Sequence, residues 1–276
     1  MRVVQISDTH ISRNHRYFQA NNERIAAQVA VLKPDLIIHT GDVSMDGAGD
    51  SRDLELARRW LEELAVETLA VPGNHDVGDL PAIKATQPVD DTRLAAWRDS
   101  FGADRWSRDV GGWRLIGLDA MLFGTGHDDE QHQYEWLAPL LATEKSIALF
   151  MHKPLCVTDP GEPACGYWTV APEPRRRLLA LLDSAPVRLV STGHLHIHRE
   201  AQIAGILHLW SPAASFVCGT SQQEDLGGER RLGLIEHSFG DDGVTSRFVR
   251  ADGLEDLLIE PVQHLVYPPS STANGQ

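Results

Sequence analysis

Cysteine is scarce in this sequence of 276 residues. Cys156, Cys165 and Cys218 are too few and too scattered for a disulfide framework or for a zinc site built from thiolates. This scarcity is typical of a protein from a reducing cytoplasm. A single disulfide between Cys156 and Cys165, which share one predicted loop, stays open as the less favoured alternative.

Long hydrophobic runs are also missing, although 42% of the residues are hydrophobic. No segment approaches the roughly 20 consecutive apolar residues that span a bilayer. The beginning of the chain turns polar at Ser7 and Asp8, too early for the apolar core of a secretory signal. We therefore predict a cytoplasmic protein that does not engage a membrane.

Positive charge is in short supply as well. Lys and Arg total 25 against 39 Asp and Glu, which gives a formal net charge of −14. Such a chain repels the phosphate backbone of nucleic acids unless bound cations reverse the sign locally. Long nucleic acid is therefore a disfavoured partner, while the composition leaves a homo-oligomer open.

The first part of the chain alternates short apolar strands with helical patterns. Strands are predicted at residues 3–6, 36–38 and 68–71, with helices at 22–32 and 53–64 between them. In the second helix, Leu54, Ala57, Leu61 and Leu64 fall on one face. This βαβαβ order indicates parallel strands joined by right-handed crossovers.

Strands dominate the rest of the predicted structure. They are expected at residues 112–119, 147–151, 187–192, 197–203, 206–210, 231–237 and 244–250, with helices at 131–141 and 175–182. The last four strands follow one another without helices, which suggests a second sheet packed on the first. Residues 153–174 form a loop of 22 residues with five prolines. Loops of this length in compact domains are more often functional than accidental.

Polar side chains follow five of the predicted strands at the point where each strand ends. They are Asp8, His10, Asp42, Asn74, His152, His194 and His196. The carboxyl ends of strands in an open α/β sheet line a common crevice, so these side chains are expected to meet. Seven oxygen and nitrogen ligands are too many for one tetrahedral zinc and suit two ions that share a carboxylate. Asp42 is the natural bridge, because its two oxygens can each bind an ion.

Five motifs in this order resemble those of the calcineurin-like metallophosphoesterase superfamily. They are Asp8-Thr9-His10, Gly41-Asp42, Gly73-Asn74-His75-Asp76, the apolar strand that ends in His152, and Gly193-His194-Leu195-His196. The resemblance covers residues 1 to about 240 and is nearest to the bacterial class III cyclic-nucleotide and glycerophosphodiester phosphodiesterases. It implies an α/β fold, a two-sheet αββα sandwich with a dinuclear site at the carboxyl ends of the strands. The catalytic domain is then expected at 1–250, followed by an extension at 251–276 with a disordered tail from Pro268.

The resemblance also implies a role for each residue of the site. One metal would be held by Asp8, His10, Asp42 and His196, and the second by Asp42, Asn74, His152 and His194. The mixed carboxylate, imidazole and amide set suits Fe, Mn, Zn or Co. A metal-bound hydroxide would attack the phosphate ester, and His75, beside the ions, would stabilise charge or protonate the leaving alkoxide.

The expected substrate is a small phosphodiester of the glycerophosphodiester or cyclic-nucleotide type. Relatives usually carry a second histidine and two prolines after the strand-end histidine, whereas this chain has Lys153, Pro154 and Leu155 after His152. A cation at Lys153 is a candidate substrate contact, as are Tyr167 and Trp168 on the long loop. A phosphomonoesterase with the same metals is the alternative. A regulatory metal-binding protein without turnover is less favoured, because no ligand position is replaced.

Overall fold

The computed structural model describes residues 1–266, which form a five-stranded and a six-stranded sheet. The first sheet has the order β11-β10-β1-β2-β3. Its strands are β1 (Arg2–Ile6), β2 (Leu36–His39), β3 (Thr68–Ala70), β10 (Leu234–Gly240) and β11 (Gly243–Val249). β1, β2 and β3 are parallel, with α1 (Gln19–Leu32) and α2 (Ser51–Glu63) in the crossovers, so the predicted βαβαβ unit is confirmed.

The second sheet has the order β4-β5-β6-β7-β9-β8. Its strands are β4 (Trp106–Val110), β5 (Trp113–Leu118), β6 (Ser146–Met151), β7 (Val187–Thr192), β8 (Arg199–Ile203) and β9 (Ile206–Trp210). The central strands β5, β6, β7 and β9 are parallel, and the antiparallel strands β4 and β8 lie at the edges. β4 and the preceding helix α4 (Asp91–Phe101) were not expected from the sequence.

The prediction that the last four strands form a sheet of their own is wrong. β9 pairs with β7 and brings β8 with it, whereas β10 pairs antiparallel with β1 and brings β11 into the first sheet. Each hairpin therefore completes an edge left open by the parallel strands. This pairing joins the first strand to a strand late in the chain, since Arg2 of β1 lies opposite Ser238 of β10.

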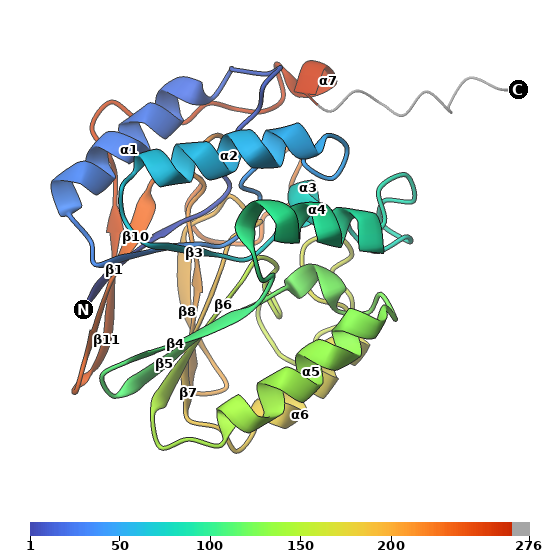
Figure 1. Ribbon diagram of the computed structural model, residues 1–276, viewed down its shortest axis with the longest axis vertical. Coiled ribbons are helices and arrows are strands. Elements are labelled where there is room, and N and C mark those ends of the chain that lie inside the picture. Colours follow the sequence, from blue (N-terminus) through green and yellow to red (C-terminus); the bar gives the residue numbers. More distant parts are fainter. Residues whose placement is uncertain (267–276) are drawn as a thin grey trace, which may run out of the picture.

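Successive side chains of each strand point to opposite faces of the sheet, and this alternation produces the layers of the sandwich. Val3 and Leu36 of the first sheet pack against Phe150 of the second sheet, while Val4 points the other way and packs with Ile25 of α1. In Figure 1 the helices α1, α2 and α4 lie on one side of the molecule, and α5 (Asp128–Leu141) and α6 (Pro172–Leu182) lie on the other. The predicted two-sheet αββα sandwich is confirmed.

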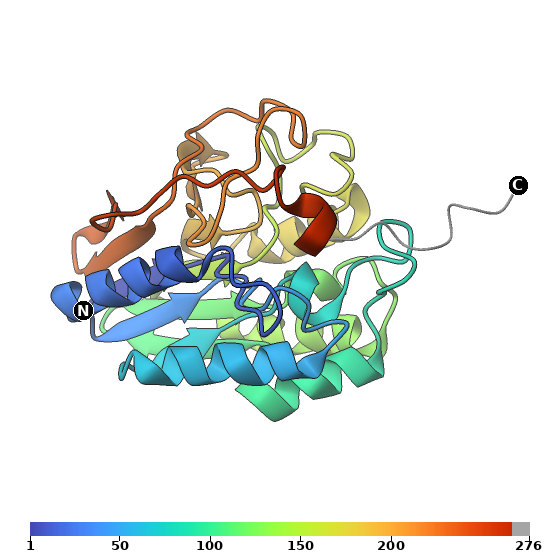
Figure 2. The same cartoon turned by 90° about the horizontal axis from the view of Figure 1, so that it is seen from above.

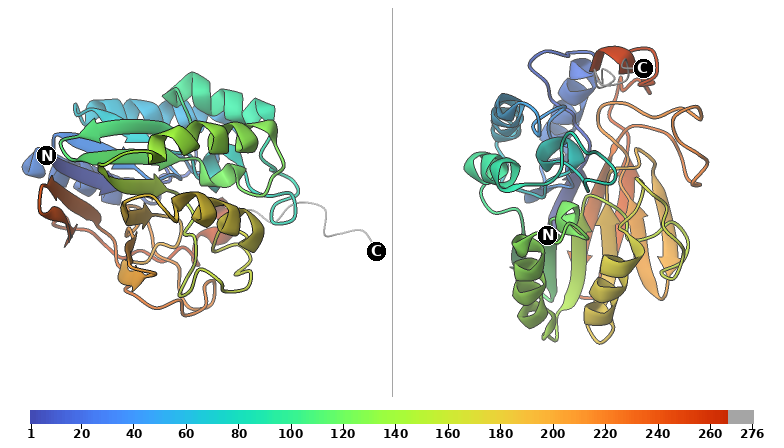
Figure 3. Two further views of the ribbon diagram at one scale, coloured as in Figure 1. Left: turned by 90° about the horizontal axis from the view of Figure 1, so that it is seen from below. Right: turned by 90° about the vertical axis from the view of Figure 1, so that its right-hand side faces the viewer.

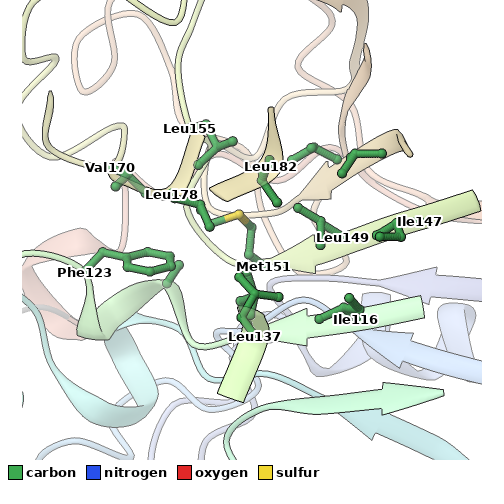
Figure 4. Close-up of a cluster of buried hydrophobic side chains, with 14 of the residues drawn as sticks. Ile116, Phe123, Leu137, Ile147, Leu149, Met151, Leu155, Val170, Leu178 and Leu182 are labelled. Carbon is green, nitrogen blue, oxygen red and sulfur yellow. The ribbon is translucent and has the colours of Figure 1, made fainter. Parts of the chain in front are cut away.

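The outer face of the second sheet is equally apolar. Leu149 and Met151 of β6 pack with Leu137 of α5 and Leu178 of α6 in a cluster from which water is excluded (Figure 4). Phe150 lies between these two residues in the sequence and faces the other sheet. Both faces of β6 are therefore buried, which holds the end of the strand, and His152 after it, in a fixed place.

The C-terminal segment returns to the side of the molecule that carries α1. In the ribbon views the red helix α7 (Gln263–Val266) lies near the blue N-terminal part of the chain (Figures 2 and 3). Ala251 and Leu254 are buried beside β10 and β11, and Val266 of α7 packs with Phe18 and Phe216. Residues 251–266 thus pack on the expected catalytic domain, and the domain boundary at 250 stays a prediction. The predicted tail lies outside the described residues.

Cys156, Cys165 and Cys218 are all unpaired, so the alternative disulfide does not form. In residues 1–266, no helix combines the length and the apolar composition that crossing a bilayer requires.

Candidate dinuclear metal centre

The carboxyl ends of strands from both sheets meet at one place. β1, β2 and β3 of the first sheet and β6 and β7 of the second sheet are each followed by predicted ligands. All seven predicted ligands are brought together and are at most 4% exposed: Asp8, His10, Asp42, Asn74, His152, His194 and His196. The site therefore lies between two sheets, and not in the crevice of one open sheet as the sequence suggested.

The donor atoms divide into two groups. One comprises Asp8, His10 and His196, and the other Asp42, His152 and His194; in each group the atoms lie within 4.8 Å of one another. Asp42 connects the groups, since its Oδ2 lies 3.7 Å from His10 Nε2 and 3.3 Å from His152 Nε2. This arrangement fits two ions that share one carboxylate.

Asn74 belongs beside the second group. Its Oδ1 lies 3.2 Å from His152 Nε2, and its Nδ2 donates a hydrogen bond to the hydroxyl of Tyr167 at 3.1 Å. The amide is thus oriented with its oxygen toward the other donor atoms. A neutral oxygen ligand there agrees with the predicted set.

Backbone carbonyls orient three of the histidines. The Nδ1 atoms of His152 and His196 lie 2.8 and 2.7 Å from the carbonyl oxygens of Thr40 and Phe216. In His194 it is Nε2 that faces a carbonyl, at 2.9 Å. An N–H donated to a carbonyl leaves the other ring nitrogen as a lone-pair donor, which is the usual arrangement around metal-binding histidines.

The carboxylates of the site are buried and ionised. Asp8 Oδ1 is inaccessible and has no hydrogen-bond partner, and the ring nitrogen Nε2 of His196 lies 3.3 Å away. Burial opposes ionisation of Asp42, but His152 and His75 outweigh it and hold the pKa of Asp42 well below its usual range. An unpartnered buried carboxylate oxygen beside imidazole nitrogens is what a cation would satisfy, so the residues fit a metal pair.

The backbone at the ligands is strained. Five of the seven adopt positive φ angles although they are not glycine: Asp8, His10, Asp42, His194 and His196, with φ between 45° and 70°. Such conformations cost of order 1–3 kcal/mol each and are characteristic of functional sites. The backbone is also crowded at Gly73, because a Cβ there would collide with Asp42 and His152. Close approach of this backbone to the ligands therefore requires glycine.

Asp76 organises the turn that carries Asn74 and was not singled out from the sequence. Its carboxylate accepts hydrogen bonds from the backbone N–H groups of Val43, Ser44 and Gly73. Burial, reinforced by the charge of Asp42, raises the pKa of Asp76 to about 7. Its position two residues after Asn74, at the start of a short helix, was the available signal.

His75 lies beside the donor groups with its ring toward the pocket. Its backbone N–H donates to Asp42 Oδ1 at 2.8 Å, and its Nδ1 lies 2.9 Å from the carbonyl oxygen of Met45. The remaining nitrogen, Nε2, is 4.0 Å from Asp42 Oδ2. His75 could also join His10 and Asp42 as a third group of donors. Burial lowers the pKa of its imidazole.

A pocket of about 340 Å³ opens over the donor atoms. Outside the predicted ligands and His75, its wall consists of Ile83, Lys84, Tyr167, Trp168, Phe216, Cys218, Gln222, Ile259 and Gln263. The ring of Tyr167 lies 4.5 Å from that of His194, and Trp168 lies next to it. A larger hollow of about 430 Å³ between α1 and α2 touches the ligand set only at His10. The smaller pocket is therefore the place for a substrate.

Lys153 is buried and its charge is compensated. Its Nζ donates to both oxygens of Asp79 at 2.8 Å, and it lies 5.3 Å from the centre of the Tyr167 ring. Lys153 does not line the pocket, whereas Lys84, which was not expected at the site, does. Nothing in the sequence marked Lys84 as a pocket residue, because the loop that carries it contains no recognisable motif.

We expect Lys153→Met to lower the free energy of unfolding by about 3 kcal/mol, because it leaves the carboxylate of Asp79 buried without its cation. Denaturant unfolding of metal-replete protein measures this. Adding Asp79→Asn to the same protein removes the unpaired charge and should recover part of the loss. Equal stability of Lys153→Met and the natural protein would contradict a buried ion pair.

Two groups of buried carboxylate and imidazole donors lie at the strand ends of a two-sheet sandwich, and Asp42 connects them. This arrangement is typical of dinuclear metallohydrolases. The family model of the calcineurin-like phosphoesterases matches residues 1–198. The chain belongs to this family and is a metallophosphoesterase.

Curated relatives support this assignment. A protein of Synechococcus sp. named as a probable cyclic nucleotide phosphodiesterase is 31% identical, with 70% of this chain and 72% of the relative covered. The 3',5'-cyclic adenosine monophosphate phosphodiesterase CpdA of Pseudomonas aeruginosa is 29% identical, with 79% of each chain covered.

Solved structures share the fold. A dimetal phosphatase from Danio rerio superposes with a TM-score of 0.62 at 14% identity, covering 90% of this chain and 95% of that one. The purple acid phosphatase PPD1 from yellow lupin also gives 0.62, at 16% identity, with 90% and 51% covered.

Proposed function

We propose that this metallophosphoesterase hydrolyses small phosphodiesters, of the cyclic-nucleotide or glycerophosphodiester type, in the cytoplasm. The observation that carries the proposal is the apolar wall of the pocket: Tyr167, Trp168, Phe216 and Ile259 line the pocket that opens over the donor atoms. A diester has a second organic group beside the one that leaves, and an aromatic wall can cover it. The names of the relatives, which include cyclic nucleotide and glycerophosphodiester phosphodiesterases, support the same substrate class.

Charge supports the same choice. A monoester carries nearly two negative charges at neutral pH and a diester one, so a site that prefers monoesters usually needs further cations. Lys153, the expected candidate, already neutralises Asp79. Lys84 is the one lysine or arginine among the described residues that line the pocket. The pocket is therefore better matched to the single charge of a diester.

The proposed metal ligands are the two predicted sets. Asp8, His10, Asp42 and His196 would hold one ion, and Asp42, Asn74, His152 and His194 would hold the other. When bound, such ions supply positive charge to the phosphoryl group and make water more acidic. The carbonyl partners of the histidines orient the ligands before any ion arrives, and the strained backbone keeps the carboxylates turned inward.

His75 is proposed to act on the leaving group. Its Nδ1 is engaged by the carbonyl of Met45, which fixes the ring and leaves Nε2 at the pocket. In the protonated form of His75, Nδ1–H stays on the carbonyl of Met45 and the second proton sits on Nε2, from which it could pass to the leaving alkoxide or stabilise its charge. The alternative of a regulatory protein without turnover has no support from the site, since all seven ligand residues and His75 are present and gathered.

Substrate preference tests the proposal. With metal-replete protein at one pH, we expect kcat/KM for bis-nitrophenyl phosphate to exceed that for nitrophenyl phosphate by about fivefold or more. Trp168→Ala should lower the diester value about tenfold, because the wall loses an aromatic face. Trp168→Phe should retain most of the activity. A natural protein that prefers the monoester would overturn the proposed substrate class, and diester turnover unaffected by Trp168→Ala would exclude the loop from substrate binding.

A further inference from the structure

Lys84 is a cation on the wall of the pocket that holds the donor atoms. It lines the pocket together with His75 and Ile83, and it is partly buried. In residues 1–266, no carboxylate oxygen lies within 4.0 Å of its ammonium group, in contrast to Lys153, which is bound by Asp79. Lys84 is thus a pocket cation whose charge is not neutralised by a direct ion pair.

The segment that carries Lys84 is closed and anchored. Asp79 and Val89 hold its ends together, because the N–H of Val89 donates to the carbonyl of Asp79 at 3.0 Å. The N–H of Lys84 donates to the carbonyl of Leu80 at 2.9 Å, which makes the backbone around it a tight turn. The buried pair of Asp79 and Lys153 then ties this segment to the end of β6, one residue after His152.

Burial and nearby carboxylates act on the ammonium group of Lys84 in opposite directions. Burial lowers the pKa of Lys84, and the carboxylates of Asp46, Asp42 and Asp79 oppose that shift. Lys84 in turn lowers the pKa of His75, so the two side chains lie within electrostatic reach of each other. A partly desolvated ammonium group without a paired carboxylate is stabilised by an anion that enters the pocket.

We propose that Lys84 is a specificity-determining residue. Its ammonium group binds a charged phosphoryl oxygen of the substrate and thereby supports the activity of the site toward phosphomonoesters. The inference rests on the proposed function only in taking this site to hydrolyse phosphate esters. A dianionic monoester gains more from a nearby cation than a monoanionic diester does, because the interaction energy scales with the charge. Lys84 therefore sets the ratio of monoester to diester activity in the natural protein.

The test is the ratio of kcat/KM for nitrophenyl phosphate to kcat/KM for bis-nitrophenyl phosphate. Lys84→Met should lower this ratio by about tenfold or more, the size expected for a lost hydrogen bond to a charged group. Lys84→Arg, which keeps the charge, should stay within about threefold of the natural ratio. Lys145→Met is the matched control, because Lys145 precedes β6 at the end opposite to His152.

A binding measurement supplements the rates. Inorganic phosphate, a multiply charged product, should inhibit Lys84→Met about tenfold more weakly than the natural protein, with metal content unchanged. An unchanged substrate ratio and unchanged phosphate inhibition in Lys84→Met would overturn the inference. A natural protein that prefers monoesters would instead overturn the proposed substrate class, and a fall of the ratio in Lys84→Met would still support the role of Lys84.

Discussion

Replacing Asp42 by asparagine is expected to lower kcat/KM for the diester by more than about 10³-fold and to reduce the metal content of both sites. Asp42 Oδ2 lies between His10 and His152, and Oδ1 accepts the backbone N–H of His75. In the variant, that N–H would hold the amide oxygen, so the amide nitrogen, which has no lone pair for a metal, would face the histidines. The change therefore damages both donor groups at once.

Asp8→Asn is the matched control, since it makes the same chemical change in a ligand that belongs to one group. Asp8 Oδ2 accepts the backbone N–H of His194 at 3.1 Å, while Oδ1 faces His196. We expect it to lose one ion and less activity than Asp42→Asn. Metal stoichiometry by elemental analysis, measured beside turnover, decides the comparison. Two tightly bound ions and a near-normal rate in Asp42→Asn would exclude a bridging role.

His75→Ala is expected to keep its metals and to lose about 10²–10⁴-fold in kcat, the range of a general acid or a charge stabiliser. The two donor groups are complete without the His75 side chain, and its backbone N–H, which holds Asp42, survives the substitution. The loss should be larger for substrates with poor leaving groups, because these depend most on a proton or on charge stabilisation.

The metal content of His75→Ala separates two roles. Its Nε2 can also join His10 and Asp42 as a donor, so loss of an ion would make His75 a ligand. An unchanged rate with good and poor leaving groups alike would exclude it from the reaction. The contact that orients the His75 ring is made by the backbone carbonyl of Met45, so a substitution of the Met45 side chain leaves this contact in place.

The candidate ligands could be predicted because each lies within four residues of the end of an apolar strand. Local alternation and short polar motifs are encoded in neighbouring residues, and the parallel arrangement of β1, β2 and β3 follows from the helices between them. Asp8, Asp42 and Asn74 therefore had to meet at one edge. His152 and His194 also follow strands, but their place opposite that edge depends on how the second sheet packs.

The sequence by itself determined most of the strands, the positions of the candidate ligands and the family, because these depend on residues that are close together along the chain. The tertiary structure alone decided that β10 completes the first sheet beside β1, that Lys153 pairs with Asp79, and that Lys84 reaches the pocket. The physical reason is distance along the chain. Strand pairing and ion pairing between distant segments depend on which edges and charges remain unsatisfied after the rest has packed, and no local pattern records that outcome.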